Sequence, residues 1–231
     1  MASEFAGRRV VVTGATGALG SAVVQHLIEA GAEVIGTCLN HDEKSQLEGL
    51  GHQRLTARVI DLTDEAAVAA MFCEIDTLWA SLHVAGGFAM GPIEDASLDD
   101  VTKMWRINAV TAFLCSREAV KRMKSAGAGR IVNISAKPAL RPAAQLSAYT
   151  MSKAAVAALT RSLAEEVGDT GVLVNAVAPS IMDTPANRQA MPDADFDKWP
   201  KVEDVATAIA YLASPANVLT NGEVLPVYGR M

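Results

Sequence analysis

A tyrosine and a lysine four residues apart are the pair in this sequence best suited to proton transfer. Tyr149 and Lys153 lie at the start of a helical pattern, and their spacing places both side chains on one face of a helix. A free tyrosine has a pKa of about 10, and a nearby ammonium group lowers it by stabilising the phenolate. The pair is therefore predicted to act as a general acid toward a carbonyl or imine that receives a hydride.

A glycine-rich loop near the N-terminus is suited to binding phosphate. It follows a β-branched run and opens a helical pattern. Glycine permits a sharp turn and a close approach of phosphate to the backbone, and the helix N-terminus adds free N–H groups. The loop is predicted to bind the pyrophosphate of a dinucleotide. The residues concerned are Gly14, Thr16, Gly17, Ala18, Leu19 and Gly20.

The adenosine end of this predicted site lacks the usual acid. A carboxylate at the end of the second strand commonly binds the ribose 2′-OH of NAD, but Cys38 stands there, followed by Leu39. A 2′-phosphate then meets no repulsive carboxylate, so the cofactor is predicted to be NADPH or NADH, with NADPH slightly favoured. Asp61 and Leu62, after the third strand, are predicted to contact the adenine edge.

Strand-like and helix-like patterns alternate along the chain and must position these residues. The strands are apolar on both faces, which indicates a parallel sheet covered by helices on each side. The predicted fold is α/β, a Rossmann-type doubly wound parallel sheet of seven strands with helices on both faces, in a single domain over residues 1–231. Strands are expected at 8–13, 33–38, 55–60, 78–85, 130–135, 172–178 and 223–227, and helices at 18–30, 42–50, 64–73, 97–124, 148–167 and 203–213.

Composition argues against several classes of function. The net charge is -6 and lysine and arginine form no dense cluster, so no nucleic acid partner is expected. No apolar run approaches about 20 residues, so no membrane association is expected. The N-terminus lacks the apolar segment of a secretion signal, which favours a cytoplasmic location. The cysteine and histidine spacings fit no metal site.

Taken together, these motifs resemble the short-chain dehydrogenase/reductase family over residues 8–227. In that family the asparagine of the long helix holds a water in a proton relay, the lysine also binds the nicotinamide ribose, and the loop after the sixth strand contacts the carboxamide. The resemblance implies a small-molecule substrate and a homodimer or homotetramer formed through helices 97–124 and 148–167. The additional residues that it places in the site are Ala85, Gly86, Asn108, Pro179, Ile181 and Thr184.

Two departures from the main family pattern resemble the dihydropteridine reductase branch. Ala18 stands where the main pattern has glycine, and Ala136 stands where the catalytic serine is expected. Ser135 is adjacent and stays a catalytic candidate, although on a strand its side chain would point to the opposite face. Residues 84–91 and 183–199 resemble the active-site loop and the substrate lid of that branch.

This branch resemblance implies the nature of the acceptor. It points to a quinonoid pterin or another activated C=O or C=N group, with Tyr149 as the proton donor and a lid at about 180–200. The implied substrate contacts are Phe88, Lys137, Asn187 and Trp199. A general reductase of ketones or 3-oxoacyl thioesters is the first alternative. A redox sensor that binds NAD(P) without catalysis is the second.

Overall fold

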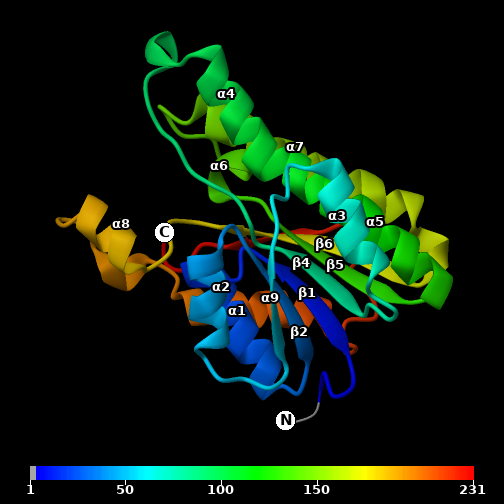
Figure 1. Cartoon of the computed structure of the whole chain (residues 1–231). Helices are drawn as coiled ribbons and strands as arrows, with labels where there is room; N and C mark the ends of the chain where they lie inside the picture. Colours follow the sequence, from blue (N-terminus) through cyan, green and yellow to red (C-terminus); the bar gives the residue numbers. More distant parts are fainter. Residues whose placement is uncertain (1–3) are drawn as a thin grey trace.

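Seven parallel strands form one sheet in residues 4–231, the part of the chain that this computed structural model describes (Figure 1). The strand order reverses at the centre of the sheet, and ligands of such open sheets bind beyond the carboxyl ends of the strands at that reversal. The predicted fold class is confirmed. Across the sheet the strands are β3 (Leu55–Val59), β2 (Glu33–Cys38), β1 (Arg9–Thr13), β4 (Ala80–His83), β5 (Gly129–Ile134), β6 (Val172–Pro179) and β7 (Val224–Val227).

Several of the helices between the strands begin where the sequence offers a side-chain cap. Asn40, Asp64 and Ser97 each accept a hydrogen bond from a backbone N–H of the first turn that follows. Two short helices were not predicted, because four to six residues are too few to show a helical period. In chain order the helices are α1 (Ala18–Glu29), α2 (His41–Glu48), α3 (Glu65–Cys73), α4 (Leu98–Met104), α5 (Thr111–Ala126), α6 (Lys137–Leu140), α7 (Ser147–Glu166), α8 (Pro185–Ala190) and α9 (Val202–Ala213).

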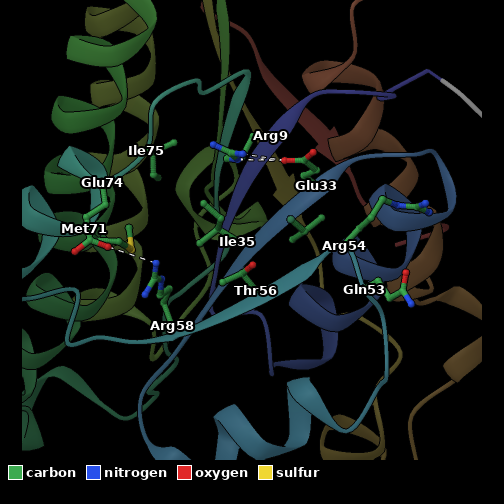
Figure 2. A pocket seen from close by; sticks show the side chains of 11 residues that line it. Arg9, Glu33, Ile35, Gln53, Arg54, Thr56, Arg58, Met71, Glu74 and Ile75 are labelled. Atoms are coloured by element: carbon green, nitrogen blue, oxygen red, sulfur yellow. Dashed lines mark hydrogen bonds and ion pairs between the residues drawn. The ribbon is translucent and has the colours of Figure 1, made fainter.

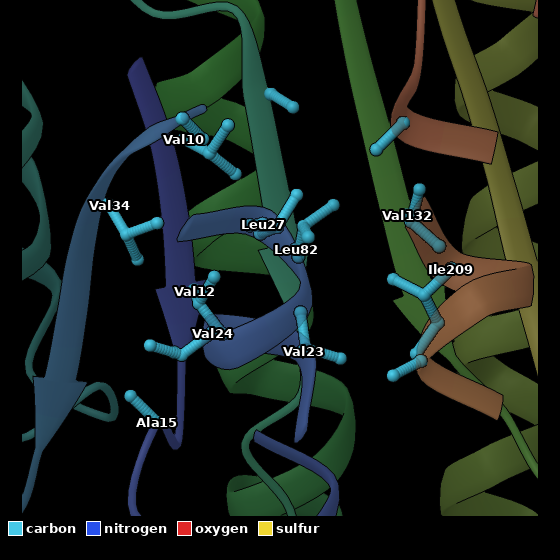
Figure 3. Close-up of a cluster of buried hydrophobic side chains, with 14 of the residues drawn as sticks. Val10, Val12, Ala15, Val23, Val24, Leu27, Val34, Leu82, Val132 and Ile209 are labelled. Carbon is cyan, nitrogen blue, oxygen red and sulfur yellow. The ribbon is translucent and has the colours of Figure 1, made fainter. Parts of the chain in front are cut away.

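Alternate residues of β1 pack on opposite faces of the sheet. Val10 and Val12 are buried against α1 and α9, where Leu27 and Ile209 lie (Figure 3). Val11, between them, packs on the other side with α3, α5 and α7. Because both faces are covered, the strands must be apolar at successive positions, which explains the continuous valine run that the sequence shows.

The helix expected over 97–124 is interrupted in its middle. A π-helical turn (Trp105–Val110) separates α4 from α5. Such turns place an extra residue in the helix and often occur at functional sites. Here the turn carries Asn108, which is buried.

The segment predicted as a lid has its two ends joined. Asp183 forms an isolated parallel bridge with Lys201, and its N–H donates to the carbonyl oxygen of Pro200 (2.9 Å). Within the segment, Arg188 donates twice to the Asp183 carboxylate (2.6 and 2.8 Å) and lies over the ring of Phe196. Helix α8 of this segment stands away from the sheet in Figure 1. Closure over a substrate remains a prediction.

Several large apolar side chains are exposed on the helices that the sequence assigned to assembly. They lie on α4, α5 and α7 and on the π-helical turn, and assembly through them remains a prediction. These residues are Leu98, Trp105, Phe113 and Met151. In the described part of the chain, no helix has the length and apolar character needed to cross a membrane.

Candidate active site

A cavity of about 590 Å³ opens at the carboxyl ends of β1, β2 and β4. All six residues predicted from the glycine-rich loop line it, as do Cys38, Asp61, Leu62, Ala85, Gly86 and Thr184. The cavity therefore lies at the reversal of strand order, where open α/β sheets bind their ligands. Pro179 and Ile181 are not among its lining residues, although Met182, next in the chain, is.

The backbone of the glycine-rich loop leaves room for phosphate. Gly14 has a φ of +63°, and a Cβ at this position would lie 2.8 Å from Cα of Ala85. A Cβ at Gly20 would overlap the carbonyl oxygen of Gly14. No side chain caps the N-terminus of α1 and no acid lies in its first turn, so its free N–H groups and positive dipole end are available to an anion. The loop fits the pyrophosphate of a dinucleotide cofactor.

The adenosine end of the cavity differs from the sequence expectation in one respect. Asp61 lines the cavity as predicted, and two hydrogen bonds from Thr63, backbone and hydroxyl, lower the pKa of its carboxyl group. The premise that this end has no acid near Cys38 is wrong, because Glu43 of α2 also lines the cavity. Sequence reasoning missed Glu43 because it lies five residues past the end of β2 at Cys38. The signal that could have revealed it is an acid three residues after Asn40, the residue that caps α2.

A second cavity, of about 310 Å³, lies beside β1, β2 and β3 (Figure 2). Two of its charged residues, Arg9 and Glu33, begin β1 and β2, so they lie at the end of those strands opposite to the first cavity. Four of its charged residues form pairs, Arg9 with Glu33 (3.0 Å) and Arg58 with Glu74 (3.4 Å). The remaining one, Arg54, donates to the carbonyl oxygen of Ile28 (2.8 Å). These contacts account for its charged side chains without a ligand, and we place the functional site in the first cavity.

Asn108 ties the loop after β4 to helix α7. Its Oδ1 accepts from the N–H of Gly87 (3.0 Å), and its Nδ2 donates to the Gly87 carbonyl (3.1 Å) and to Oγ of Ser152 (3.1 Å). A Cβ at Gly86 would lie 2.5 Å from Oδ1 of Asn108 and 3.2 Å from Nζ of Lys153. The glycine therefore allows both side chains to approach the cavity wall.

Burial dominates the proton affinities of the Tyr149 and Lys153 pair. It raises the pKa of Tyr149 to about 12 and lowers the pKa of Lys153 to about 8. The expectation that the ammonium lowers the tyrosine pKa is therefore wrong for this structure. Nζ of Lys153 donates to the carbonyl oxygen of Ile134 (2.9 Å). Tyr149 is protonated at neutral pH, as a proton donor must be.

The lowered pKa of Lys153 predicts how reduction depends on pH. Its ammonium is present below pH 8 and is lost as the pH rises through about 8. The neutral amine carries no charge with which to bind the cofactor in the cavity beside Gly86, where a Cβ would lie 3.2 Å from Nζ of Lys153. We therefore expect kcat/KM for reduction, which reports the free enzyme, to decline above about pH 8 in a steady-state profile. A profile that stays level to about pH 10, the range of an ordinary lysine, would contradict this assignment.

The hydroxyl group of Ser135 has a partner away from the cavity. Ser135 is buried, and its Oγ donates to the carbonyl oxygen of Lys153 (2.9 Å), so in this structure it supports α7. Ala136, at the family's serine position, follows β5 and caps α6 in an extended conformation. Its methyl group offers no hydrogen bond. A catalytic role for Ser135 remains a prediction.

The structure brings two of the four predicted substrate residues to the site. The ring of Phe88 lies 5.0 Å from that of Tyr149, edge to face, and Phe88 is 61% exposed. Asn187 lines the cavity, and its Nδ2 donates to the Met182 carbonyl (2.8 Å). By contrast, Lys137 lies over the ring of Tyr228 (5.4 Å). Trp199 is buried against Phe196.

A glycine-rich loop that fits a pyrophosphate lines a cavity whose wall at Gly86 approaches Lys153, and Tyr149 lies one helical turn from that lysine. This combination defines a dinucleotide-dependent oxidoreductase. The family profile described as short chain dehydrogenase matches residues 8–195. The chain therefore belongs to the short-chain dehydrogenase/reductase family and is an NAD(P)-dependent enzyme of that family.

Individual relatives agree over nearly the whole chain. It is 36% identical to the cis-4-hydroxycyclohexanecarboxylate dehydrogenase of Sinomonas cyclohexanicum, covering 99% of this chain and 98% of the relative. It is 31% identical to a short-chain type dehydrogenase/reductase of Picea abies, covering 96% and 92%. Among solved structures, ElxO with NADP bound superposes with a TM-score of 0.90 at 25% identity, covering 96% of this chain and 97% of that one.

Proposed function

We propose that this enzyme reduces an electron-poor C=O or C=N acceptor, such as a quinonoid dihydropterin, with NADH or NADPH. The bound nicotinamide would supply the hydride. Tyr149, which burial keeps protonated, donates the proton to the acceptor oxygen or nitrogen. The Asn108 amide fixes the Gly87 loop, and Lys153 lies beside Gly86 at the cavity wall.

The observation that carries this proposal is the missing hydroxyl at Ala136. A ketone oxygen develops negative charge as hydride arrives, and a positioned donor stabilises that charge. Ala136 supplies no donor, and the adjacent Ser135 hydroxyl is bonded to the Lys153 carbonyl. An acceptor that is already electron-poor needs this donor less. The site therefore favours activated acceptors over simple ketones.

Two further features support a flat heterocyclic acceptor. Phe88 presents an exposed aromatic ring beside the proton donor, and aromatic rings pack against planar π-systems in offset or edge-to-face geometry. The segment that resembles the dihydropteridine reductase lid is internally bonded through Asp183 and Arg188, while Thr184 and Asn187 face the cavity.

Restoring the hydroxyl with Ala136→Ser tests the acceptor class. We expect kcat/KM on a simple ketone to rise by about tenfold or more, because removing one such donor from other enzymes costs about 10²–10³ in kcat. Reduction of quinonoid dihydropterin should change much less. Ala139→Ser, which adds a hydroxyl elsewhere on α6, is the matched control and should change neither rate. Equal effects on both acceptors would count against the proposal.

General ketone reduction is the second candidate, and one comparison favours it. The relative from Sinomonas cyclohexanicum is named for a dehydrogenase of a cyclic alcohol. For this candidate the Ser135 hydroxyl would have to leave the Lys153 carbonyl and reach the acceptor. Ser135→Ala should then abolish ketone reduction, whereas under the favoured proposal it should leave the reduction of quinonoid dihydropterin in place.

A further inference from the structure

The carboxylate of Glu43 occupies the adenosine end of the cofactor cavity. Glu43 belongs to the first turn of α2 and is half-buried. Its Oε2 accepts from the hydroxyl of Thr16 (2.9 Å) and from the N–H of Leu39 (3.0 Å). Thr16 belongs to the glycine-rich loop, and Leu39 follows the end of β2. The carboxylate therefore bridges the two segments between which the adenosine ribose of a dinucleotide lies in this fold.

Charge at this end of the cavity favours a hydroxyl group over a phosphate. Among the described residues that line the cavity, Glu43 and Asp61 carry carboxylates, and neither a lysine nor an arginine is present. The nearest cation in sequence, Lys44, points its ammonium to Glu48 (3.5 Å). A ribose 2′-OH can donate to a carboxylate at this position, whereas a 2′-phosphate would bring about two further negative charges with no cation to bind them.

We propose that Glu43 sets the cofactor preference of the enzyme by accepting the ribose 2′-OH of NADH and repelling the 2′-phosphate of NADPH. This inference rests on the proposed use of a nicotinamide cofactor and reverses the slight preference for NADPH that Cys38 alone suggested. In other dinucleotide-binding folds a carboxylate at the end of the second strand accepts the ribose 2′-OH. Here the carboxylate would come from the helix that follows β2.

A purely structural role for Glu43 makes a different prediction. Asn40 caps α2, with its Oδ1 accepting from the Glu43 N–H (2.9 Å), and a Glu43 that only completed this cap would stabilise the helix. Its removal would lower the melting temperature and weaken both cofactors equally. A role in recognition instead changes the ratio of the two affinities.

The test measures binding of NADH and NADPH through the fluorescence of the reduced nicotinamide, in wild type and in Glu43→Gln. We expect wild type to bind NADH at least about tenfold more tightly than NADPH, or about 1.4 kcal/mol, and Glu43→Gln to lose most of that difference by gaining affinity for NADPH. Asp42→Asn removes an exposed acid from the same first turn of α2 that does not line the cavity, and should leave the ratio unchanged. Competition by 5′-AMP and 2′,5′-ADP should show the same preference without the nicotinamide.

The possible outcomes distinguish a failure of the proposed role of Glu43 from a failure of the proposed use of a nicotinamide cofactor. If wild type binds NADPH as tightly as NADH, or if Glu43→Gln weakens both cofactors equally, the role of Glu43 is refuted while a nicotinamide-dependent enzyme stands. If wild type binds neither reduced cofactor, the proposed function fails together with it.

Discussion

Replacing Tyr149 with phenylalanine is expected to lower kcat for reduction by about 10²–10⁴-fold, the usual contribution of a positioned general acid. The change removes one hydroxyl group and keeps the ring that packs edge to face against Phe88. Because burial raises the pKa of Tyr149 to about 12, nearly every molecule carries the proton at neutral pH, and no ionised fraction dilutes the effect. Steady-state rates with saturating reduced cofactor measure the loss.

Two readouts separate this loss from a folding defect. Tyr211→Phe removes the hydroxyl of an exposed tyrosine on α9 and should leave kcat unchanged. Cofactor binding to the Tyr149→Phe protein should stay within about threefold of wild type, equivalent to less than 1 kcal/mol. Near-native turnover would mean that the acceptor takes its proton from another group or from water.

Replacing Gly14 with alanine is expected to cost both stability and cofactor affinity. The φ of +63° disfavours any side chain by about 1–2 kcal/mol, and the added Cβ would lie 2.8 Å from the backbone of Ala85. Forcing that contact adds about 1–3 kcal/mol and displaces the glycine-rich loop from the end of β4. We expect a lower midpoint in chemical denaturation and at least about a tenfold weaker binding of NADH.

Gly127 provides the matched control for this prediction. It has nearly the same backbone conformation, with a φ of +70°, but no atom lies within 4 Å of a Cβ placed there. Gly127→Ala should therefore lower stability only by the cost of a side chain at positive φ, and it should leave NADH binding unaffected. Equal effects of the two substitutions would show that the approach of Gly14 to Ala85 is unimportant for the cofactor site.

The parts of this structure that sequence patterns predicted are those set by local physical constraints. The run Val10–Val12 is apolar at successive positions because helices cover both faces of the sheet. Gly14 and Gly20 are required because a Cβ would strike neighbouring backbone. The spacing of Tyr149 and Lys153 follows from the helix period. These features depend on short stretches of chain, so the sequence displays them directly.

The parts that the sequence did not predict depend on contacts between distant segments. Glu43 reaches Thr16 across 27 positions, and an acid in the first turn after the Asn40 cap does not by itself indicate that contact. The hydrogen bond from Ser135 to the Lys153 carbonyl on α7 likewise depends on how the helix packs against the sheet. The proton affinity of Tyr149 was predicted in the wrong direction because burial, the dominant cause, belongs to the folded state. The π-helical turn at Asn108 leaves no periodic signal.

The most direct test of the central claim is a steady-state comparison of quinonoid dihydropterin with a panel of simple ketones, using wild-type enzyme and either reduced cofactor. We expect that the pterin is reduced readily, that ketones are poor acceptors because Ala136 provides no hydrogen bond, and that NADH supports the reaction better than NADPH. Rapid reduction of plain ketones with no activity toward the pterin would contradict this expectation.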